Sequence, residues 1–226
     1  MTRSEYGVLD GRTKYLFLRN VLSPKTVANR GEALRHLRFR AVRYSRRPCF
    51  VGSEGGCLSF GWTSNPQPRL FKDTKGNPIP YYFTLSLLLG ELSGLVKRYL
   101  PKDWEEARET ARANGYRLIG SGFGPPDVPI ISFQEPIFSS VAINKDTTCR
   151  SHVDAKNASG LGCMTVFGKF QRGAFCMPRL RLVFDVQPGD VLVADTNNEQ
   201  HGNLDGPDGE RISVVAYLTE LKNRVM

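Results

Sequence analysis

The second half of the chain is a series of short runs with strand character, separated by residues that favour turns. Gly, Pro, Asn and Asp divide these runs from about residue 130 onward. The runs are PIISF, IFSSVAIN, GCMTVFG, RLRLVFDV, DVLVADT and RISVVAYLTE. Several short strands at this spacing predict a barrel or a sandwich of antiparallel sheets.

The first half adds helices, so the sequence predicts an α+β fold. Ser23 can cap a helix that has Pro24 at its first position. The expected elements are strands over 14–18 and 57–62 and helices from Pro24 to about Phe39, over 82–99 and over 102–114. With 40% hydrophobic residues among 226, and no repeat or long linker, we expect a single domain over 1–226.

Cysteine usage and hydropathy indicate where such a chain works. The five cysteines are odd in number and lack CxxC spacing, which favours a reduced compartment. The N-terminus lacks the apolar core of a signal peptide, and Glu91 interrupts the most apolar stretch. We therefore expect an intracellular monomer without a membrane span or an obligate protein partner, in the cytoplasm of a bacterial or phage-infected cell, or in a eukaryotic nucleus.

Positive charge is concentrated near the N-terminus. Between Arg19 and Arg47, nine basic residues accompany a single acid, Glu32, so this basic segment carries +8 of the formal +9. Such a segment is typical of a surface that binds the phosphates of nucleic acid. The alternative is a solvated helix face followed by a basic loop. The residues predicted to contact a DNA backbone are Arg35, Arg38, Arg40, Arg43, Arg46 and Arg47.

Two of the three histidines lie in the strand-rich half, and one belongs to an HxD pair. His152 and Asp154 are two residues apart, so in an extended segment both side chains point the same way. His201 follows the run DVLVADT and a polar turn, where a neighbouring strand could present it to the same ion. Two imidazoles and one carboxylate form the ligand set of non-haem Fe(II) oxygenases. HxD also occurs by chance in turns and surface pairs.

Two residues that could bind a carboxylate, Arg211 and Ser213, follow His201 closely in the sequence. Arg211 begins the last strand-like run ten residues after His201, and Ser213 shares its strand face. A guanidinium binds a carboxylate bidentately, and a hydroxyl adds a hydrogen bond, which suits the distal carboxylate of 2-oxoglutarate. The alternative is a strand-edge arginine paired with Glu210 or Glu220.

In these segments the sequence resembles a known family. INKDTTCRSHVDAKNASGLGCMTVFG, VFDVQPGDVLVADTNNEQHGN and ERISVVAYL are similar to the catalytic core of the TET/JBP-type Fe(II)/2-oxoglutarate dioxygenases, especially the compact phage-like and fungal-transposon-like members. The resemblance covers about 137–219; residues 1–136, which include the basic segment, would flank this core. It implies a double-stranded β-helix (jelly-roll, cupin-like) with flanking helices packed on one sheet, and Fe(II), 2-oxoglutarate and O₂ as cofactors.

The resemblance also assigns roles to single residues. His152, Asp154 and His201 fall on the metal positions and Arg211 on the 2-oxoglutarate anchor, with Ser213 beside it. Asn144 and Arg150 match positions that help to bind the co-substrate, although Asn144 could simply end a strand. Asn157 stands where many relatives have an acidic residue that contacts the base edge. Because of this departure, the resemblance does not decide which base is oxidised. Tyr217 would stack on the base, or serve as a core tyrosine.

The function implied is oxidation of a base methyl group in double-stranded DNA. The leading hypothesis is conversion of 5-methylcytosine to 5-hydroxymethylcytosine, and further, on a base flipped out of its duplex. Three alternatives stay open at this point. They are oxidation of thymine, N6-methyladenine or RNA, oxidation of a protein or small molecule, and nucleic-acid binding without catalysis.

Overall fold

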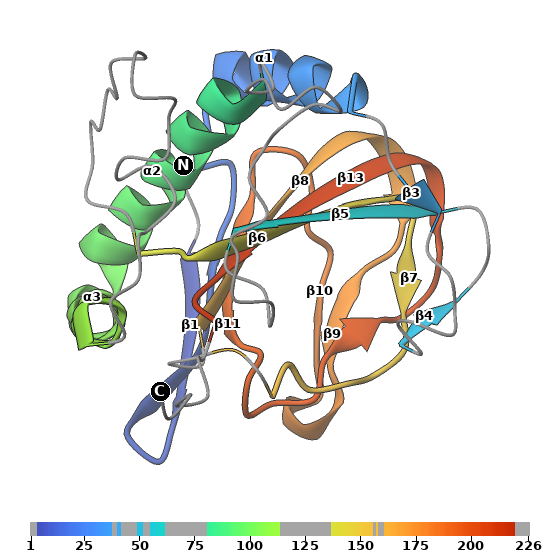
Figure 1. The fold of residues 1–226 in the computed structure, drawn as a ribbon. Helices are drawn as coiled ribbons and strands as arrows, with labels where there is room; N and C mark the ends of the chain where they lie inside the picture. Colours follow the sequence, from blue (N-terminus) through green and yellow to red (C-terminus); the bar gives the residue numbers. More distant parts are fainter. Residues whose placement is uncertain are drawn as a thin grey trace, which may run out of the picture.

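The computed structural model describes residues 4–37, 40–41, 49–51, 55–61, 81–113, 137–155, 157 and 161–219. In this part of the chain, three helices accompany thirteen strands (Figure 1). The helices are α1 (Pro24–Arg35), α2 (Tyr81–Tyr99) and α3 (Pro101–Ala113). The strands are β1 (Ser4–Leu9), β2 (Arg12–Leu18), β3 (Arg40–Ala41), β4 (Phe50–Val51), β5 (Gly56–Gly61), β6 (Ser140–Lys145), β7 (Thr148–Cys149), β8 (Leu161–Arg172), β9 (Phe175–Met177), β10 (Leu182–Phe184), β11 (Val191–Asp195), β12 (Gly202–Asn203) and β13 (Pro207–Tyr217).

The strands form one large sheet and two small ones. The large sheet has the order β1-β2-β11-β8-β13-β6-β5-β3, and its neighbouring strands are antiparallel. A three-stranded sheet, β10-β9-β12, and a two-stranded sheet, β4-β7, lie across from it (Figure 1). This is the jelly-roll arrangement, in which strands distant in sequence pair across a barrel.

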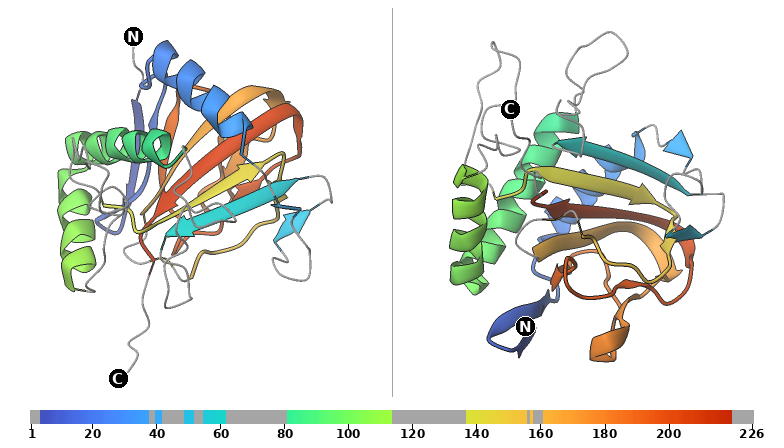
Figure 2. Two further views of the ribbon diagram at one scale, coloured as in Figure 1. Left: turned by 45° about the horizontal axis from the view of Figure 1, so that its top comes forward. Right: turned by 60° about the horizontal axis from the view of Figure 1, so that its bottom comes forward.

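All three helices cover the outer face of the large sheet (Figure 2). Apolar residues of α2, such as Leu85 and Leu92, share a buried cluster with Phe167 and Ile212 of the sheet. The helix faces and the outer sheet face therefore exclude water together, which removes the sheet's apolar surface from solvent. A second cluster, which includes Phe17, Met164 and Phe184, fills the space between the large and the three-stranded sheet.

The period of two along each strand decides which side chains enter the barrel. On β13, Ile212 and Val214 are completely buried in the helix-facing cluster. Arg211 and Ser213 alternate with them and therefore face the barrel interior, where both line a cavity. The same alternation on β6 sends Ile143 toward the helices and leaves its neighbours inside.

Most of the predicted elements are confirmed, and two boundaries are wrong. The first helix ends at Arg35 rather than near Phe39, because Leu37 N donates to Leu34 O and closes a tight final turn. The run RLRLVFDV is a strand only over Leu182–Phe184. It is preceded by a 3₁₀ turn over Pro178–Leu180, and Arg181 has a positive φ of 55°, which interrupts an extended chain. The predicted strand PIISF lies outside the described residues.

No helix within the described ranges is both long and apolar enough to cross a membrane.

Candidate metal centre and co-substrate cavity

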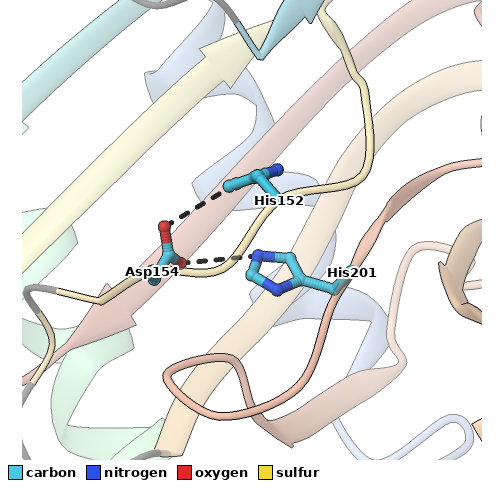
Figure 3. Close-up of side chains that lie close together, drawn as sticks. All are labelled: His152, Asp154 and His201. Atoms are coloured by element: carbon cyan, nitrogen blue, oxygen red, sulfur yellow. Dashed lines mark ion pairs between the residues drawn. The ribbon is translucent and has the colours of Figure 1, made fainter. Parts of the chain in front are cut away.

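Two chain segments that are distant in sequence meet at the HxD pair. His152 and His201 form an antiparallel bridge, in which each backbone N–H donates to the other's carbonyl at 2.9 Å. Asp154 N donates to Thr196 O at 2.9 Å, so the same loop is attached at a second point. This pairing brings all three side chains to one place, as Figure 3 shows.

The three predicted ligands lie within reach of one ion. Their donor atoms are all within 4.8 Å of one another. Asp154 Oδ1 is 3.7 Å from His152 Nε2, and Asp154 Oδ2 is 3.5 Å from His201 Nε2. Metal–ligand bonds of about 2 Å put adjacent donor atoms roughly 3 Å apart, so this cluster is close to the size that one ion requires. The structure thus gathers the residues that the sequence predicted.

Hydrogen bonds fix the orientation of both imidazoles. His152 Nδ1 is 2.8 Å from Arg150 O, and His201 Nδ1 is 3.1 Å from Glu199 O. A carbonyl oxygen only accepts, so each Nδ1 carries the hydrogen and each Nε2 is left to bind a metal. Phe175 stacks on the His201 ring at 5.5 Å, which restricts the ring further. Burial favours a higher pKa for Asp154, but its interactions with His201 and His152 outweigh burial and lower the pKa, so the carboxylate is ionised.

A cavity of about 570 Å³ opens beside this cluster. It is lined by all three ligands and by five further residues that the sequence singled out, namely Asn144, Asn157, Arg211, Ser213 and Tyr217. Arg150 is exposed and does not line it. The strand alternation on β13 therefore places its predicted co-substrate and base residues along one wall.

The buried, charged side chain of Arg211 can bind an anion in the cavity. Its side chain is 4% exposed, and its Nε has no hydrogen-bond partner in the described part of the chain. Burial lowers the pKa of Arg211 to about 10, so the group is still charged at neutral pH. Of the two partners considered in the alternative, Glu210 binds Lys145 at 3.0 Å and Arg35 at 2.7 Å instead, and Glu220 lies outside the described residues. A buried guanidinium without a carboxylate in contact is costly, and a bound carboxylate offsets that cost.

Asp146 holds the Arg211 backbone in place. Asp146 Oδ1 accepts from Arg211 N at 2.7 Å, and Asp146 N donates to Arg211 O at 2.9 Å. The Arg211 guanidinium also lies 5.6 Å from the Phe170 ring centre. Neither supporting residue belongs to a motif that could be recognised in the sequence. Asp146 is marked only in the structure, by its left-handed φ of 50°.

Two short motifs in the segment VFDVQPGDVLVADTNNEQHGN, PGD (188–190) and HGN (201–203), have structural roles. Asp190 of PGD accepts from Asn20 N and Gln187 N at 2.8 and 3.0 Å, and it closes the turn into β11. A Cβ on Gly202 of HGN would lie 2.8 Å from Cys149 O, which is backbone and cannot yield easily. Glycine is therefore needed where β12 crosses the segment that leads to His152.

The basic segment is described only in part. Arg38, Arg43, Arg46, Arg47 and the side chain of Arg40 lie outside the described residues. Arg35 contacts Glu32 at 3.2 Å as well as Glu210. This arginine is thus engaged in ion pairs at the protein surface.

The donor set identifies the class of the site. Two imidazoles with free Nε2 atoms and one ionised carboxylate suit a mononuclear ferrous ion and leave coordination positions for other ligands. A jelly-roll barrel surrounds it, and a buried arginine lies in the same cavity. These features define a non-haem Fe(II) oxygenase.

Comparison with known proteins gives the family. The Tet_JBP profile, described as the oxygenase domain of the 2OGFeDO superfamily, matches residues 63–220, which is more than half of the chain. The chain belongs to this family and contains an oxygenase domain of the type that uses Fe(II), 2-oxoglutarate and O₂.

Relatives match part of the chain in sequence, and solved structures match it in fold. The bifunctional helicase and thymine dioxygenase JBP2 of Leishmania infantum is 36% identical over 88 residues, as is that of Leishmania major. The match covers 36% of this chain and only 8% of each relative. The structure of NgTET1 in complex with 5mC DNA matches 93% of this chain and 74% of that one, with a TM-score of 0.56 and 19% identity. A 2OG-Fe(II) oxygenase family oxidoreductase from Burkholderia pseudomallei matches 90% of this chain and 84% of its own at a TM-score of 0.51 and 15% identity. Both structures support the jelly-roll fold.

Proposed function

We propose that this protein oxidises the methyl group of 5-methylcytosine in double-stranded DNA to 5-hydroxymethylcytosine, and that it can carry the oxidation further. The observation that carries the proposal is the single cavity that contains the ligand triad, the buried Arg211 and two residues suited to hold a base, Asn157 and Tyr217. The similar proteins support it, because they include a thymine dioxygenase and a protein bound to 5mC DNA.

The cavity offers distinct surroundings for co-substrate and base. Its volume of about 570 Å³ lies within the range of small-molecule sites. Arg211 and Ser213 offer donors for a carboxylate, whereas Tyr217 and the apolar Met164 and Leu192 offer surface for a planar ring. Asn157 is 6% exposed and has both a donor and an acceptor for a base edge.

The residues of the chain bind and orient the reactants. His152, Asp154 and His201 would hold the ferrous ion, and Arg211 with Ser213 would hold the distal carboxylate of 2-oxoglutarate. When bound, iron with 2-oxoglutarate and O₂ supplies the oxidising power that converts a C–H bond to C–OH while the co-substrate loses CO₂ and becomes succinate. The barrel wall excludes water from this reaction, and Tyr217 and Asn157 would position the methyl group toward the metal.

A base inside a duplex cannot reach this cavity, so the nucleotide must be flipped out. The basic segment would hold the flanking phosphates during this step, which fixes the position of the DNA without reading its sequence.

Neutralising Arg43, Arg46 and Arg47 together to glutamine is expected to weaken duplex binding and to reduce its salt dependence. Each lost phosphate contact lowers the slope of log K against log salt by about 0.9. Fluorescence anisotropy at several salt concentrations measures the slope, and iron occupancy should stay unchanged. The matched control replaces Arg98, Arg108 and Arg112 of α2 and α3, which lie outside the basic segment. Equal affinity and equal slope in the first variant would leave the segment without a role in DNA binding.

Thymine is the second candidate, favoured by the thymine dioxygenase activity of the JBP2 relatives. Thymine and 5-methylcytosine carry the same C5 methyl group and differ at the edge that Asn157 could read. The deciding experiment incubates the protein aerobically with iron and 2-oxoglutarate on duplexes that contain 5-methylcytosine, N6-methyladenine or only unmodified bases, and on RNA. Nucleoside mass spectrometry then identifies the product. We expect 5-hydroxymethylcytosine that is absent when chelator is added; 5-hydroxymethyluracil alone would replace the proposal with thymine oxidation.

A further inference from the structure

A buried ion-pair cluster lies behind the loop that presents His201, and no part of it lines the cavity. Lys14 Nζ lies 3.0 Å from Asp195 Oδ2 and 3.0 Å from Glu199 Oε1. The Lys14 side chain is 12% exposed and each carboxylate side chain is 5% exposed. None of the three contacts the co-substrate cavity, so a direct role in chemistry does not account for their burial.

The cluster follows from the sheet order. β2 pairs with β11, with Tyr15 opposite Ala194, so the next residues outward, Lys14 and Asp195, meet where β11 ends. A lysine from the N-terminal hairpin thereby reaches the last residue of β11, from which the connection to His201 continues. Among the residues that the structure describes, Lys14 is the covered cation that faces both carboxylates, since Arg179 is 3.8 Å from Glu199 Oε2 and its own side chain is 66% exposed.

The two carboxylates arrange the connection itself. Asp195 Oδ1 accepts from Asn198 N at 3.2 Å and from Asn198 Nδ2 at 2.9 Å. Asp195 O accepts from Glu199 N at 3.0 Å, which closes a turn. Glu199 O then accepts from His201 Nδ1 at 3.1 Å, the hydrogen bond that directs His201 Nε2 toward Asp154. The Glu199 side chain and the Glu199 carbonyl thus join Lys14 to the metal ligand.

We propose that Lys14 is a positioning residue for the iron site, which holds Glu199 so that its carbonyl fixes the tautomer and direction of His201. A group hydrogen-bonded directly to a metal ligand, as Glu199 O is, usually contributes about 10–100-fold to metal affinity, and Lys14 acts through that group. The charge state of Lys14 is consistent with this role. Burial alone lowers the pKa of Lys14, but its hydrogen bonds to Glu199 and Asp195 outweigh burial and raise the pKa, so the cation is maintained. The proposal rests on the iron site and is independent of which base is oxidised.

The test measures metal binding without nucleic acid or turnover. Co²⁺ serves as the probe, titrated into metal-free protein and followed by its visible absorption, with Lys14→Met, Lys14→Arg and a matched surface control, Lys102→Met. We expect Lys14→Met to weaken Co²⁺ binding several-fold, up to about 10-fold, and to alter the absorption spectrum. Lys14→Arg, which keeps the cation, should recover most of the affinity, and Lys102→Met should match the wild type.

A purely structural role would lower the melting temperature of the metal-free protein and leave the Co²⁺ affinity and spectrum of the folded fraction unchanged; this result overturns the proposal. If Lys14→Met does not fold, Glu199→Gln gives the answer, because it keeps the side-chain volume and removes the charge that Lys14 binds. Several-fold weaker Co²⁺ binding supports the inference, and wild-type binding with a wild-type spectrum contradicts it. A protein that binds Co²⁺ but oxidises no base would refute the proposed function and leave this inference standing.

Discussion

Replacing His201 with alanine is expected to abolish turnover and to lower metal affinity by at least about a hundredfold, because losing even an outer partner of a ligand costs about 10–100-fold. His201 is 5% exposed, and its Nε2 is 3.5 Å from Asp154. Removing the ring leaves two donors and one surplus coordination position. It also leaves Glu199 O without the donor that it binds in the native protein.

Loss of folding must be separated from loss of the metal, and ligand-linked stability does this. Metal at 100 times its Kd stabilises the wild type by about 2.7 kcal/mol, which raises the Tm of a chain of this size by roughly 5–11 °C. His201→Ala should show no such rise, whatever its Tm in chelator. His36→Ala is the control, since His36 is exposed and contacts Glu32 at 3.1 Å. A metal-dependent rise in His201→Ala equal to that of the wild type would remove His201 from the site.

The candidate site could be predicted from sequence because its residues obey strand periodicity. His152 with Asp154, and Arg211 with Ser213, are pairs at a spacing of two, and both pairs converge in the structure. What the sequence could not show is the bridge between His152 and His201, which depends on two backbone hydrogen bonds between segments almost fifty residues apart. Scarcity of histidine, not a local pattern, pointed to His201.

Elements were missed where they are too short to have a period. Two-residue and three-residue strands such as β12 and β9 carry no alternation that could be recognised. The β1-β2 hairpin is different, because its turn residues Asp10 and Gly11 both have positive φ and form the Asp-Gly signal for a tight hairpin. That signal was present in the sequence and would have predicted β1.

The buried charges were beyond sequence reasoning for another reason. A lysine on an alternating strand reads as solvent-facing, but β11 and its following loop bring two carboxylates to Lys14, whose side chain is 12% exposed. Pairing of this kind is decided by the sheet order, which a single sequence does not show. The same holds for Asp146, whose contacts with the Arg211 backbone join the end of β6 to the neighbouring strand β13.

Arg211→Lys is expected to raise the 2-oxoglutarate concentration needed for half-maximal activity by about 10–100-fold. Charged hydrogen bonds contribute about 1.5–3 kcal/mol, and each 1.4 kcal/mol is a factor of ten. Lysine keeps the charge but has no planar fork, so it cannot bind a carboxylate bidentately. The lysine side chain also lacks the guanidinium that lies over the Phe170 ring in the native protein, so the space above this ring is left unfilled. Turnover at saturating 2-oxoglutarate should fall much less.

Two measurements make this result specific to the co-substrate. Metal affinity without 2-oxoglutarate should be unchanged, because Arg211 contributes no ligand atom to the cluster of His152, Asp154 and His201. Arg172→Lys is the matched control, since Arg172 lies on the same strand pair but is 61% exposed and binds Asp205 at 3.0 Å. If Arg211→Lys shows the wild-type dependence on 2-oxoglutarate, the guanidinium binds some other anion. A guanidinium that is buried without a carboxylate partner in the described ranges still requires a negatively charged partner.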